Sequence, residues 1–439
     1  MTGLVIASDK SGGGKTTITM GLIKALTNRN YKVQGYKVGP DYIDTGFHTF
    51  ISGQDSRNLD IHLMGEEGVQ ASFSRGKGDI AIVEGVMGFY DGIGLETHCS
   101  TAHVANLIGL PVVLVLSPKA QMATLFAQIK GILSYENNNI VGVVLNNISE
   151  SYYERLKVGI EKYCNLKVFG YLPTDPEVEI ESRSLGLIIN TEIANLVERI
   201  DYLSLLIEKY IDVPGLVEAM GEAPHYKDDF KVEKKDIKIG VARDNAFNFY
   251  FKENLELLEQ TGKVVYFSPL KDKKLPKNLD VLYIGGGYLE IFSKKLSQNK
   301  SLLKDIKDQL DNGLRCYAES SGMLYLTEGT KENPLVGFFE GQYYMSTKLQ
   351  NFGYANLVVC KENSMIPKGL KINSQEFHRS YVRLKEKPIY CISKDQPDGS
   401  QKTWQCGYQK NNTVGTYAQI HFFGNMELLK SICQIEKGD

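Results

Sequence analysis

A glycine-rich stretch near the N-terminus has the residues needed to hold phosphate. Residues 10–17 read Lys-Ser-Gly-Gly-Gly-Lys-Thr-Thr, and they lie between an apolar run and a helical pattern. Glycines let backbone N–H groups converge on phosphate oxygens, and a helix N-terminus adds its dipole. Lys15 would reach the β- and γ-phosphates, and the Thr16 hydroxyl would bind Mg²⁺. The predicted nucleotide-binding residues are Lys10, Gly12, Gly13, Gly14, Lys15, Thr16, Thr17 and Asn146.

Two carboxylates add a metal-binding chemistry to this stretch. Asp41 and Glu84 each follow an apolar run, so both are predicted at the carboxyl ends of strands, where an open parallel sheet binds its ligands. Mg²⁺ takes one or two carboxylates together with substrate phosphate. Either residue alone could be a helix cap or a turn residue, and Asn146 could likewise be a turn asparagine. Their joint occurrence with the phosphate loop favours a metal site formed by Thr16, Asp41 and Glu84.

The second half of the chain contains a candidate nucleophile. Residues 313–326 run from an apolar strand through a small-residue turn into a helix start, which would lift Ser320 above the sheet edge beside free backbone N–H groups. A nucleophile of this kind needs a nearby base, for which His378 and His421 are the candidates. The glycines at residues 285–287 also follow a strand-like run, although a plain turn would use glycine as well.

These residues require two α/β domains to position them. Residues 4–7, 80–83, 112–116 and 140–145 are apolar without alternation, which indicates strands buried on both faces of a parallel sheet. Amphipathic patterns at residues 16–28 and 122–133 predict helices between them. A proline-containing, highly charged stretch at 223–236 predicts a linker between domains at 1–222 and 237–439. Strands at 237–242, 264–267, 281–284 and 315–318 begin the second series.

Composition restricts the class of protein. The chain has 439 residues with a formal net charge of −2, which favours two domains and gives no basic field for nucleic acid. It has neither a signal-peptide pattern nor an apolar run of ~18 residues, so we expect a cytoplasmic protein without a membrane partner. The seven cysteines are widely spaced, and we expect reduced, mostly buried thiols.

Several motifs together resemble the cobyrinate a,c-diamide synthase family. The segments are Lys37-Val-Gly-Pro-Asp-Tyr-Ile-Asp44, Glu84-Gly-Val-Met-Gly88, residues 173–187, residues 283–290 and Tyr317-Ala-Glu-Ser-Ser-Gly-Met-Leu-Tyr-Leu326. They occur in family order over about residues 3–430. The phosphate loop lacks the first glycine of the strict pattern, which would fall at Asp9. With Lys10 it resembles the deviant loop of dethiobiotin synthetases and partition ATPases.

The resemblance implies a glutamine-hydrolysing second domain, with one departure. Ser320 occupies the position of the family's nucleophilic cysteine. The resemblance assigns the oxyanion site to Gly286, Gly287 and Ser321, and the base to His421, the second histidine of the family's C-terminal motif. Gln419 replaces the first of those histidines, and no third residue that orients the base can be named. Because the residues around the elbow are retained, an engineered cysteine-to-serine change is favoured over a naturally inactive site.

The implied reaction is the ATP- and Mg²⁺-dependent amidation of the a and c acetate groups of cobyrinate, with ammonia from L-glutamine. Phosphorylation would turn each carboxylate into an acyl phosphate, and Lys15 and Mg²⁺ would neutralise the transferring group. The resemblance implies substrate positions at Lys37, Tyr42 and Asp44 in the first motif and at Asp91, three residues after the second motif. The implied fold is a phosphate-loop, doubly wound, mostly parallel α/β domain followed by a class I glutamine amidotransferase-like α/β domain.

Two alternatives share these motifs in whole or in part. A nickel-sirohydrochlorin a,c-diamide synthase would show every one of them. A partition-type ATPase switch with an inert amidotransferase-like module is compatible with Lys10 and Ser320, but the segments at 37–44 and 84–88 favour the synthetase. The sequence leaves open the order of amidation and whether the chain forms a homodimer.

Overall fold

The chain divides into two compact units. The computed structural model describes residues 1–178 and 196–434, so the part of the third motif beyond residue 178 lies outside the described residues. Unit 1 comprises Met1–Ile61 and Glu66–Asp229, and unit 2 comprises His62–Gly65 and Phe230–Asp439. The division at residues 229 and 230 falls inside the predicted linker.

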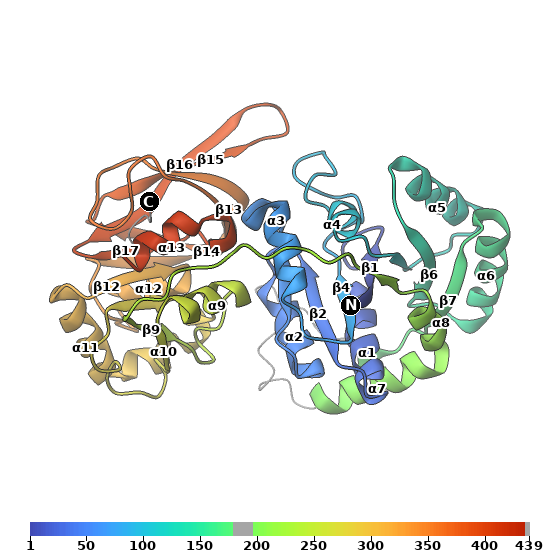
Figure 1. The fold of residues 1–439 in the computed structure, drawn as a ribbon, viewed down its shortest axis with the longest axis horizontal. Coiled ribbons are helices and arrows are strands. Elements are labelled where there is room, and N and C mark those ends of the chain that lie inside the picture. The colour runs from blue at the N-terminus through green and yellow to red at the C-terminus, as the bar shows by residue number, and fades with distance from the viewer. Residues whose placement is uncertain (179–195, 435–439) are drawn as a thin grey trace. The chain divides into compact units, whose positions relative to one another are not determined.

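Unit 1 is built on a parallel sheet with helices on both faces (Figure 1). The strand order is β3-β2-β4-β1-β5-β6-β7, and a short β8 (Gly221–Glu222) pairs antiparallel with β1. The parallel strands are β1 (Thr2–Ser8), β2 (Val33–Val38), β3 (Arg57–Leu59), β4 (Ile80–Glu84), β5 (Val112–Leu116), β6 (Ile140–Asn146) and β7 (Lys167–Leu172). Strands β2 to β4 lie on one side of β1, and strands β5 to β7 lie on the other side. The carboxyl ends of β1, β2 and β4 therefore lie together at one edge of the sheet, beside the point where the strand order switches.

Helices bury the apolar faces of this sheet. Side chains of α1, α2 and α7 form one core cluster with β1, β4 and β5, which includes Ile6, Ile82 and Val113. The helices are α1 (Lys15–Asn28), α2 (Tyr42–Ser52), α3 (Ile61–Ser74), α4 (Thr101–Ile108), α5 (Ala123–Tyr135), α6 (Glu150–Cys164), α7 (Leu196–Tyr210) and α8 (Val213–Glu218). A short 3₁₀ helix follows β7 at Pro176–Val178.

Unit 2 combines parallel and antiparallel pairing in one sheet of order β10-β9-β11-β12-β17-β16-β15-β13-β14. The parallel part consists of β9 (Lys238–Ala242), β10 (Lys263–Phe267), β11 (Val281–Ile284), β12 (Arg315–Glu319) and β17 (Thr413–Thr416). The antiparallel part consists of β13 (Gly341–Val359), β14 (Lys371–Leu384), β15 (Pro388–Asp395) and β16 (Gln401–Lys410). The helices are α9 (Lys252–Thr261), α10 (Leu289–Gln298), α11 (Lys300–Asp311), α12 (Ser321–Leu326) and α13 (Met426–Ile432).

The predicted α/β organisation is confirmed, and one chemical expectation is wrong. Every strand predicted from an unalternated apolar run lies in one of the two parallel arrays. The cysteines are not all reduced, because Cys360 and Cys391 form a disulfide. Cys360 lies just after β13 and Cys391 on β15, so antiparallel pairing brings together thiols that lie far apart in the sequence. None of the described helices is both long and apolar enough to cross a membrane.

Close packing between β1 and β4 yields a prediction on stability. A Cβ atom at Gly3 would lie 2.5 Å from the Ala81 carbonyl oxygen and 2.7 Å from the Ala81 Cβ. We expect Gly3→Ala to lower the free energy of unfolding of unit 1 by about 1–3 kcal/mol, since backbone in paired central strands cannot move away cheaply. Thermal and urea unfolding of the full chain measure the change.

Gly46→Ala in α2 is the matched control, because a Cβ there meets nothing within 4 Å. A helical alanine should leave the stability unchanged or raise it by about 0.5–1 kcal/mol. Equal stability of the Gly3→Ala variant and the unchanged protein would contradict the tight contact between β1 and β4.

Candidate functional site

The phosphate loop lies between β1 and α1, at the carboxyl edge of the sheet. Gly12 and Gly14 have φ values of +73° and +96°, a conformation that L side chains rarely adopt. The Lys15 ammonium donates to the carbonyl oxygens of Lys10 (3.0 Å) and Met87 (2.6 Å). Burial and the neighbouring Lys37 lower the pKa of Lys15 to about 8. The loop thus holds its lysine along its own backbone, close to where phosphate would bind.

Asn146, the last residue of β6, contacts the backbone of the phosphate loop. Its side-chain amide donates to the Gly13 carbonyl oxygen (3.3 Å) and to the Ser117 hydroxyl (3.2 Å). Ser117 in turn donates to the same carbonyl at 2.8 Å. A Cβ at Gly14 would lie 2.0 Å from the Asn146 amide nitrogen. The structure therefore gives Asn146 a contact with the phosphate loop, whereas its predicted contact with a bound nucleotide stays a prediction.

A buried cluster of charges surrounds Glu84, the last residue of β4. One carboxylate oxygen accepts from the Thr16 hydroxyl (2.6 Å) and from the Lys37 ammonium (2.8 Å). The other lies 2.8 Å from His48 Nε2. Lys37 also forms a 2.6 Å ion pair with Asp44. Because Lys37 and Glu84 face each other in the register of β2 and β4, the sheet itself sets their pairing.

The charges of this cluster depend on one another. Burial opposes ionisation of Glu84, but Lys37 and His48 outweigh it and hold the pKa of that carboxyl well below its usual range. Burial likewise opposes the charge on Lys37, yet Glu84 and Asp44 raise the pKa of Lys37 well above its usual range. Burial and the Glu84 charge raise the pKa of Asp44 to about 7. The stable core of the cluster is therefore the Lys37–Glu84 ion pair.

Two other predicted carboxylates serve local structure. Asp41 caps α2, since its Oδ1 accepts from the backbone N–H groups of Ile43 (2.7 Å) and Asp44 (3.1 Å). Tyr42 follows it as the first residue of the helix. Asp91 accepts from the Gly88 N–H at 2.8 Å within a turn. Lys10 is exposed, 3.7 Å from Asp9, and Thr17 lies one residue beyond Thr16 in α1.

Sequence reasoning assigned no role to His48, although it contacts Glu84. Asp44 and His48 are separated by one helical turn in α2, so both can face the same partner. That spacing was the available signal. It could not identify the partner, because Glu84 is 36 residues further along the chain.

In unit 2, Ser320 occupies a strained turn between β12 and α12. Its φ and ψ are +50° and −117°, an uncommon conformation for a residue other than glycine. Its N–H donates to the Thr416 carbonyl at 2.7 Å, and the Ser321 hydroxyl donates to the Gly287 carbonyl at 2.8 Å. A Cβ at Gly322 would lie 2.2 Å from the Ile284 carbonyl oxygen. The predicted elbow and the glycine loop after β11 therefore lie in direct contact.

Gln419 lies beside this glycine loop. A Cβ at Gly286 would be 3.1 Å from the Gln419 amide nitrogen. The Gln419 carbonyl oxygen accepts from the Gln375 side-chain amide at 3.0 Å, and the backbones of these two residues also pair. A neutral pair of amides thus stands next to the predicted oxyanion site.

The structure pairs neither candidate histidine with Ser320. His421 is fully buried, and its Nδ1 accepts from the Phe423 N–H at 3.2 Å. This contact leaves the proton on Nε2, which lies 3.3 Å from the Glu253 carboxylate. His378 has its two ring nitrogens against the Ser380 carbonyl and the Glu376 carboxylate, at 2.8 and 2.9 Å. Glu253, on α9, is the partner of His421 that the sequence could not identify.

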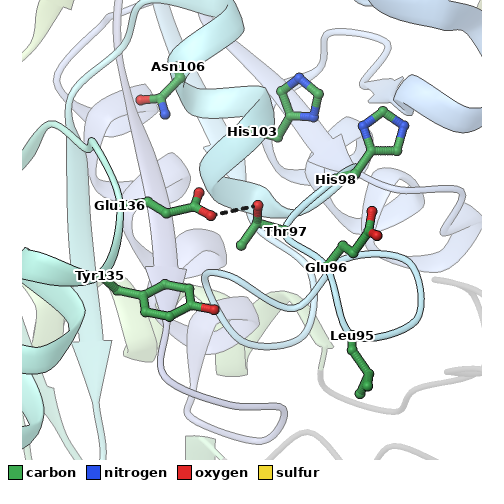
Figure 2. Close-up of a pocket in the computed structure, with 8 residues that line it drawn as sticks. All are labelled: Leu95, Glu96, Thr97, His98, His103, Asn106, Tyr135 and Glu136. Atoms are coloured by element: carbon green, nitrogen blue, oxygen red, sulfur yellow. Dashed lines mark hydrogen bonds between the residues drawn. The ribbon is translucent and has the colours of Figure 1, made fainter. Parts of the chain in front are cut away.

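A separate polar cavity of about 550 Å³ lies beside α4 and the end of α5 (Figure 2). The Thr97 hydroxyl donates to the Glu136 carboxylate across it at 3.0 Å, and the rings of His98 and His103 are 5.2 Å apart. The residues that line it include none of the predicted site residues. Among the described residues, no group of three or more histidines, cysteines or carboxylates is arranged to hold a metal.

Comparisons with known proteins cover both units. The CobQ/CobB/MinD/ParA nucleotide binding domain model matches residues 4–188, and the CobB/CobQ-like glutamine amidotransferase domain model matches residues 238–427. Proteins named cobyrinate a,c-diamide synthase are similar along the whole chain. That of Clostridium tetani is 56% identical, covering 99% of this chain and 100% of the relative. That of Clostridium acetobutylicum is 53% identical, covering 98% and 100%.

Similarity to solved structures is weaker and limited to one unit at a time. PurLQS from Thermotoga maritima has a TM-score of 0.34 at 14% identity, covering 46% of this chain and 99% of that chain. MinD with Mg-ADP from Pyrococcus horikoshii has a TM-score of 0.29 at 18% identity, covering 40% and 82%. The two family models by themselves confirm the predicted pairing of a phosphate-loop domain with an amidotransferase-like domain.

Proposed function

The chain belongs to the cobyrinate a,c-diamide synthase family, and we propose that it uses ATP to amidate the a and c acetate carboxylates of cobyrinate. Members of this family are carbon–nitrogen ligases with glutamine as donor of the amide nitrogen. The observation that supports the proposal most is the contact of Thr16, at the phosphate loop, with Glu84 in the buried cluster. It brings the loop and both family segments to one edge of the sheet.

The proposed chemistry is activation of the carboxylate by phosphorylation. A carboxylate resists attack by ammonia because oxide is a poor leaving group, and an acyl phosphate removes that obstacle. Lys15 would neutralise the β- and γ-phosphates, and the loop N–H groups would hold them. Lys37 and Asp44 would bind the acceptor side chain. Ammonia would then displace phosphate from the acyl group.

Mg²⁺ fits the oxygen donors of this site. Thr16 Oγ1 and Glu84 Oε1 lie 2.6 Å apart, and Asp41 keeps a second oxygen beyond the one that caps α2. Mg²⁺ needs few protein ligands, because waters and phosphate oxygens complete its shell. When bound, it supplies positive charge to the phosphates. Thr16, Glu84 and Asp41 are the residues proposed to hold it.

The proposed nitrogen source of this chain is free ammonia, because Ser320 replaces a thiol. A cysteine ionises near pH ~8.5, whereas an alcohol must lose its proton during attack. Cys316 is not a substitute, because complete burial raises the pKa of its thiol well above the usual range. Gln419 is a second departure from the family pattern beside the same turn, which a single engineered change at Ser320 does not explain. The retained elbow would bind glutamine but hydrolyse it very slowly.

We first predict that Lys15→Ala abolishes amidation of cobyrinate with either ammonium chloride or glutamine. Loss of the Lys15 ammonium, which contacts the backbone of the loop at Lys10, should lower the rate by at least about 100-fold. The measurement is product formation by the purified full chain with ATP and Mg²⁺. Near-normal amidation with ammonium chloride would contradict the assignment of the synthetase site.

The same assay separates the alternatives. Nickel-sirohydrochlorin as acceptor tests the sister activity, and amidation of that compound alone would replace cobyrinate in the proposal. A partition-type switch would hydrolyse ATP in response to a protein or membrane partner and would amidate neither tetrapyrrole.

A second prediction concerns the metal. Glu84→Gln should raise the Mg²⁺ concentration needed for half-maximal activity by at least about tenfold, since an amide replaces the charged oxygen. Asp41→Asn should cause a smaller rise, because it keeps an acceptor for the helix cap while removing the charge. Activity is titrated with Mg²⁺ after thermal unfolding has shown both variants to be folded. An unmoved titration would restrict the altered carboxylate to a structural role.

A third prediction concerns the elbow. Glutaminase turnover should be very slow in this chain, higher in Ser320→Cys, and higher again by at least about tenfold in Ser320→Cys/Gln419→His. The second change places an imidazole beside Gly286, where a general base typically contributes more than tenfold. Gln419→His alone is the control. Equal rates in the unchanged protein and Ser320→Cys would contradict the proposed nucleophile position, and no gain from Gln419→His would return the base to His421.

A further inference from the structure

Strands β13 and β14 of unit 2, whose course is drawn in Figure 1, carry several large side chains that are exposed. We define the aromatic–arginine face as Tyr344 and Phe352 of β13 with Phe377, Arg379, Tyr381 and Arg383 of β14. The four aromatic residues are 37%, 54%, 42% and 38% exposed, in chain order. Scattered exposed aromatics are normal, but a contiguous group marks a binding surface.

The β-sheet brings these side chains to one side. Residues 377, 379, 381 and 383 alternate along β14 with the buried His378 and Ser380, so they point away from the core. Tyr344 stands directly opposite Tyr381 in the strand register. The rings of Tyr344 and Tyr381 stack with centroids 5.3 Å apart. Phe352 and Phe377 make a second pair at 5.3 Å.

The positive charges on this face have no carboxylate partner in the described part of the chain. The Arg383 guanidinium lies over Tyr344 at 5.4 Å and near Tyr381 at 5.9 Å. Arg379 Nε is buried and has no hydrogen-bond partner among the described residues. The nearby Lys394 donates to the Phe352 carbonyl instead of an acid. Glu376, the adjacent carboxylate on β14, turns inward to His378 and Trp404.

We propose that the aromatic–arginine face binds the macrocycle of the tetrapyrrole acceptor. This inference rests on the proposed function and adds a binding surface in unit 2 to it. A tetrapyrrole acid is a flat conjugated ring with carboxylates around its rim. Aromatic side chains offer such a ring stacking area, and arginines pair with its carboxylates through two parallel hydrogen bonds.

A second copy of this chain fits the face less well. Copies related by a two-fold axis would bring Arg379 and Arg383 toward the same residues of the partner copy, where like charges repel. A ligand that carries several negative charges and a flat apolar body matches both features at once. The same chemistry predicts weaker binding at high salt, since the charged contacts lie at the surface.

The test is the binding of cobyrinate to the full chain without ATP or glutamine, followed by the change in its absorbance spectrum. We expect Phe377→Ser/Arg383→Gln to raise the Kd for cobyrinate at least about tenfold. The KM for cobyrinate should rise in parallel, while the KM for ATP and the kcat at saturating cobyrinate stay within about twofold. Arg383→Lys keeps the charge but not the paired hydrogen bonds, and should give an intermediate Kd.

Tyr266→Ser/Arg243→Gln is the matched control. Arg243 lies over Tyr266 at 5.0 Å, so it is also an exposed arginine–tyrosine pair of unit 2, and it lies on the opposite edge of the sheet. This variant should bind cobyrinate like the unchanged protein. Far-UV circular dichroism and thermal unfolding establish that all variants are folded.

Unchanged affinity for cobyrinate in both face variants would overturn this inference, whether or not sedimentation shows a change in oligomeric state. Failure of the unchanged protein to bind either cobyrinate or nickel-sirohydrochlorin would instead overturn the proposed function. An equal loss of affinity in the Tyr266→Ser/Arg243→Gln control would also overturn the inference, because the effect would not be specific to this face.

Discussion

The buried ion pair between Lys37 and Glu84 is the constraint on which the synthetase site depends. Removing two charges from water is costly unless each is fully partnered. Here the pair lies on β2 and β4, and its further partners come from α1 and α2. Thr16 and His48 complete the hydrogen bonds of Glu84, while Asp44 shares Lys37. Loss of one member would leave an uncompensated buried charge. The phosphate loop, β2, β4 and α2 are therefore held in one arrangement before any substrate binds.

Local patterns made the parallel strands and the turns after them predictable in both units, because the residues that determine them lie close together in the sequence. The unalternated apolar runs at residues 112–116 and 281–284 each became a parallel strand with the predicted bounds. The glycines at residues 12–14 lie between strand and helix, and so does Ser320. In each case a short segment of sequence determines a strand, a turn or a helix start. The position of that segment in the sheet then follows, because a strand, a helix and the next parallel strand connect in one preferred way.

Contacts between distant residues could not be predicted in the same way. The contacts of His48 with Glu84 and of His421 with Glu253 form only when the strands and helices have packed together. The disulfide of Cys360 with Cys391 depends on the pairing of β13 with β15, which no spacing in the sequence reveals. The role of Asp41 as a helix cap could not be predicted from the sequence either. Its position after a strand suits both a metal ligand and a helix cap, and the cap contacts became visible only in the structure.

The two predicted sites differ in how their side chains are partnered. In unit 1 each charged residue of the cluster has a partner whose charge or hydrogen bond complements it. In unit 2 the strained turn at Ser320 adjoins the glycine loop, which the Ser321 hydroxyl contacts, and a neutral pair of amides lies beside that loop. The side-chain amides of Gln375 and Gln419 form a hydrogen bond with each other, and His421 contacts Glu253.

Backbone strain is costly and persists only where the surrounding structure imposes it. Packing contributes to the conformation of this turn, because Gly322 lies close to the Ile284 carbonyl and the Ser321 hydroxyl donates to the Gly287 carbonyl. A retained elbow is consequently weak evidence for retained hydrolysis, and the side chains near Ser320 carry the argument about activity.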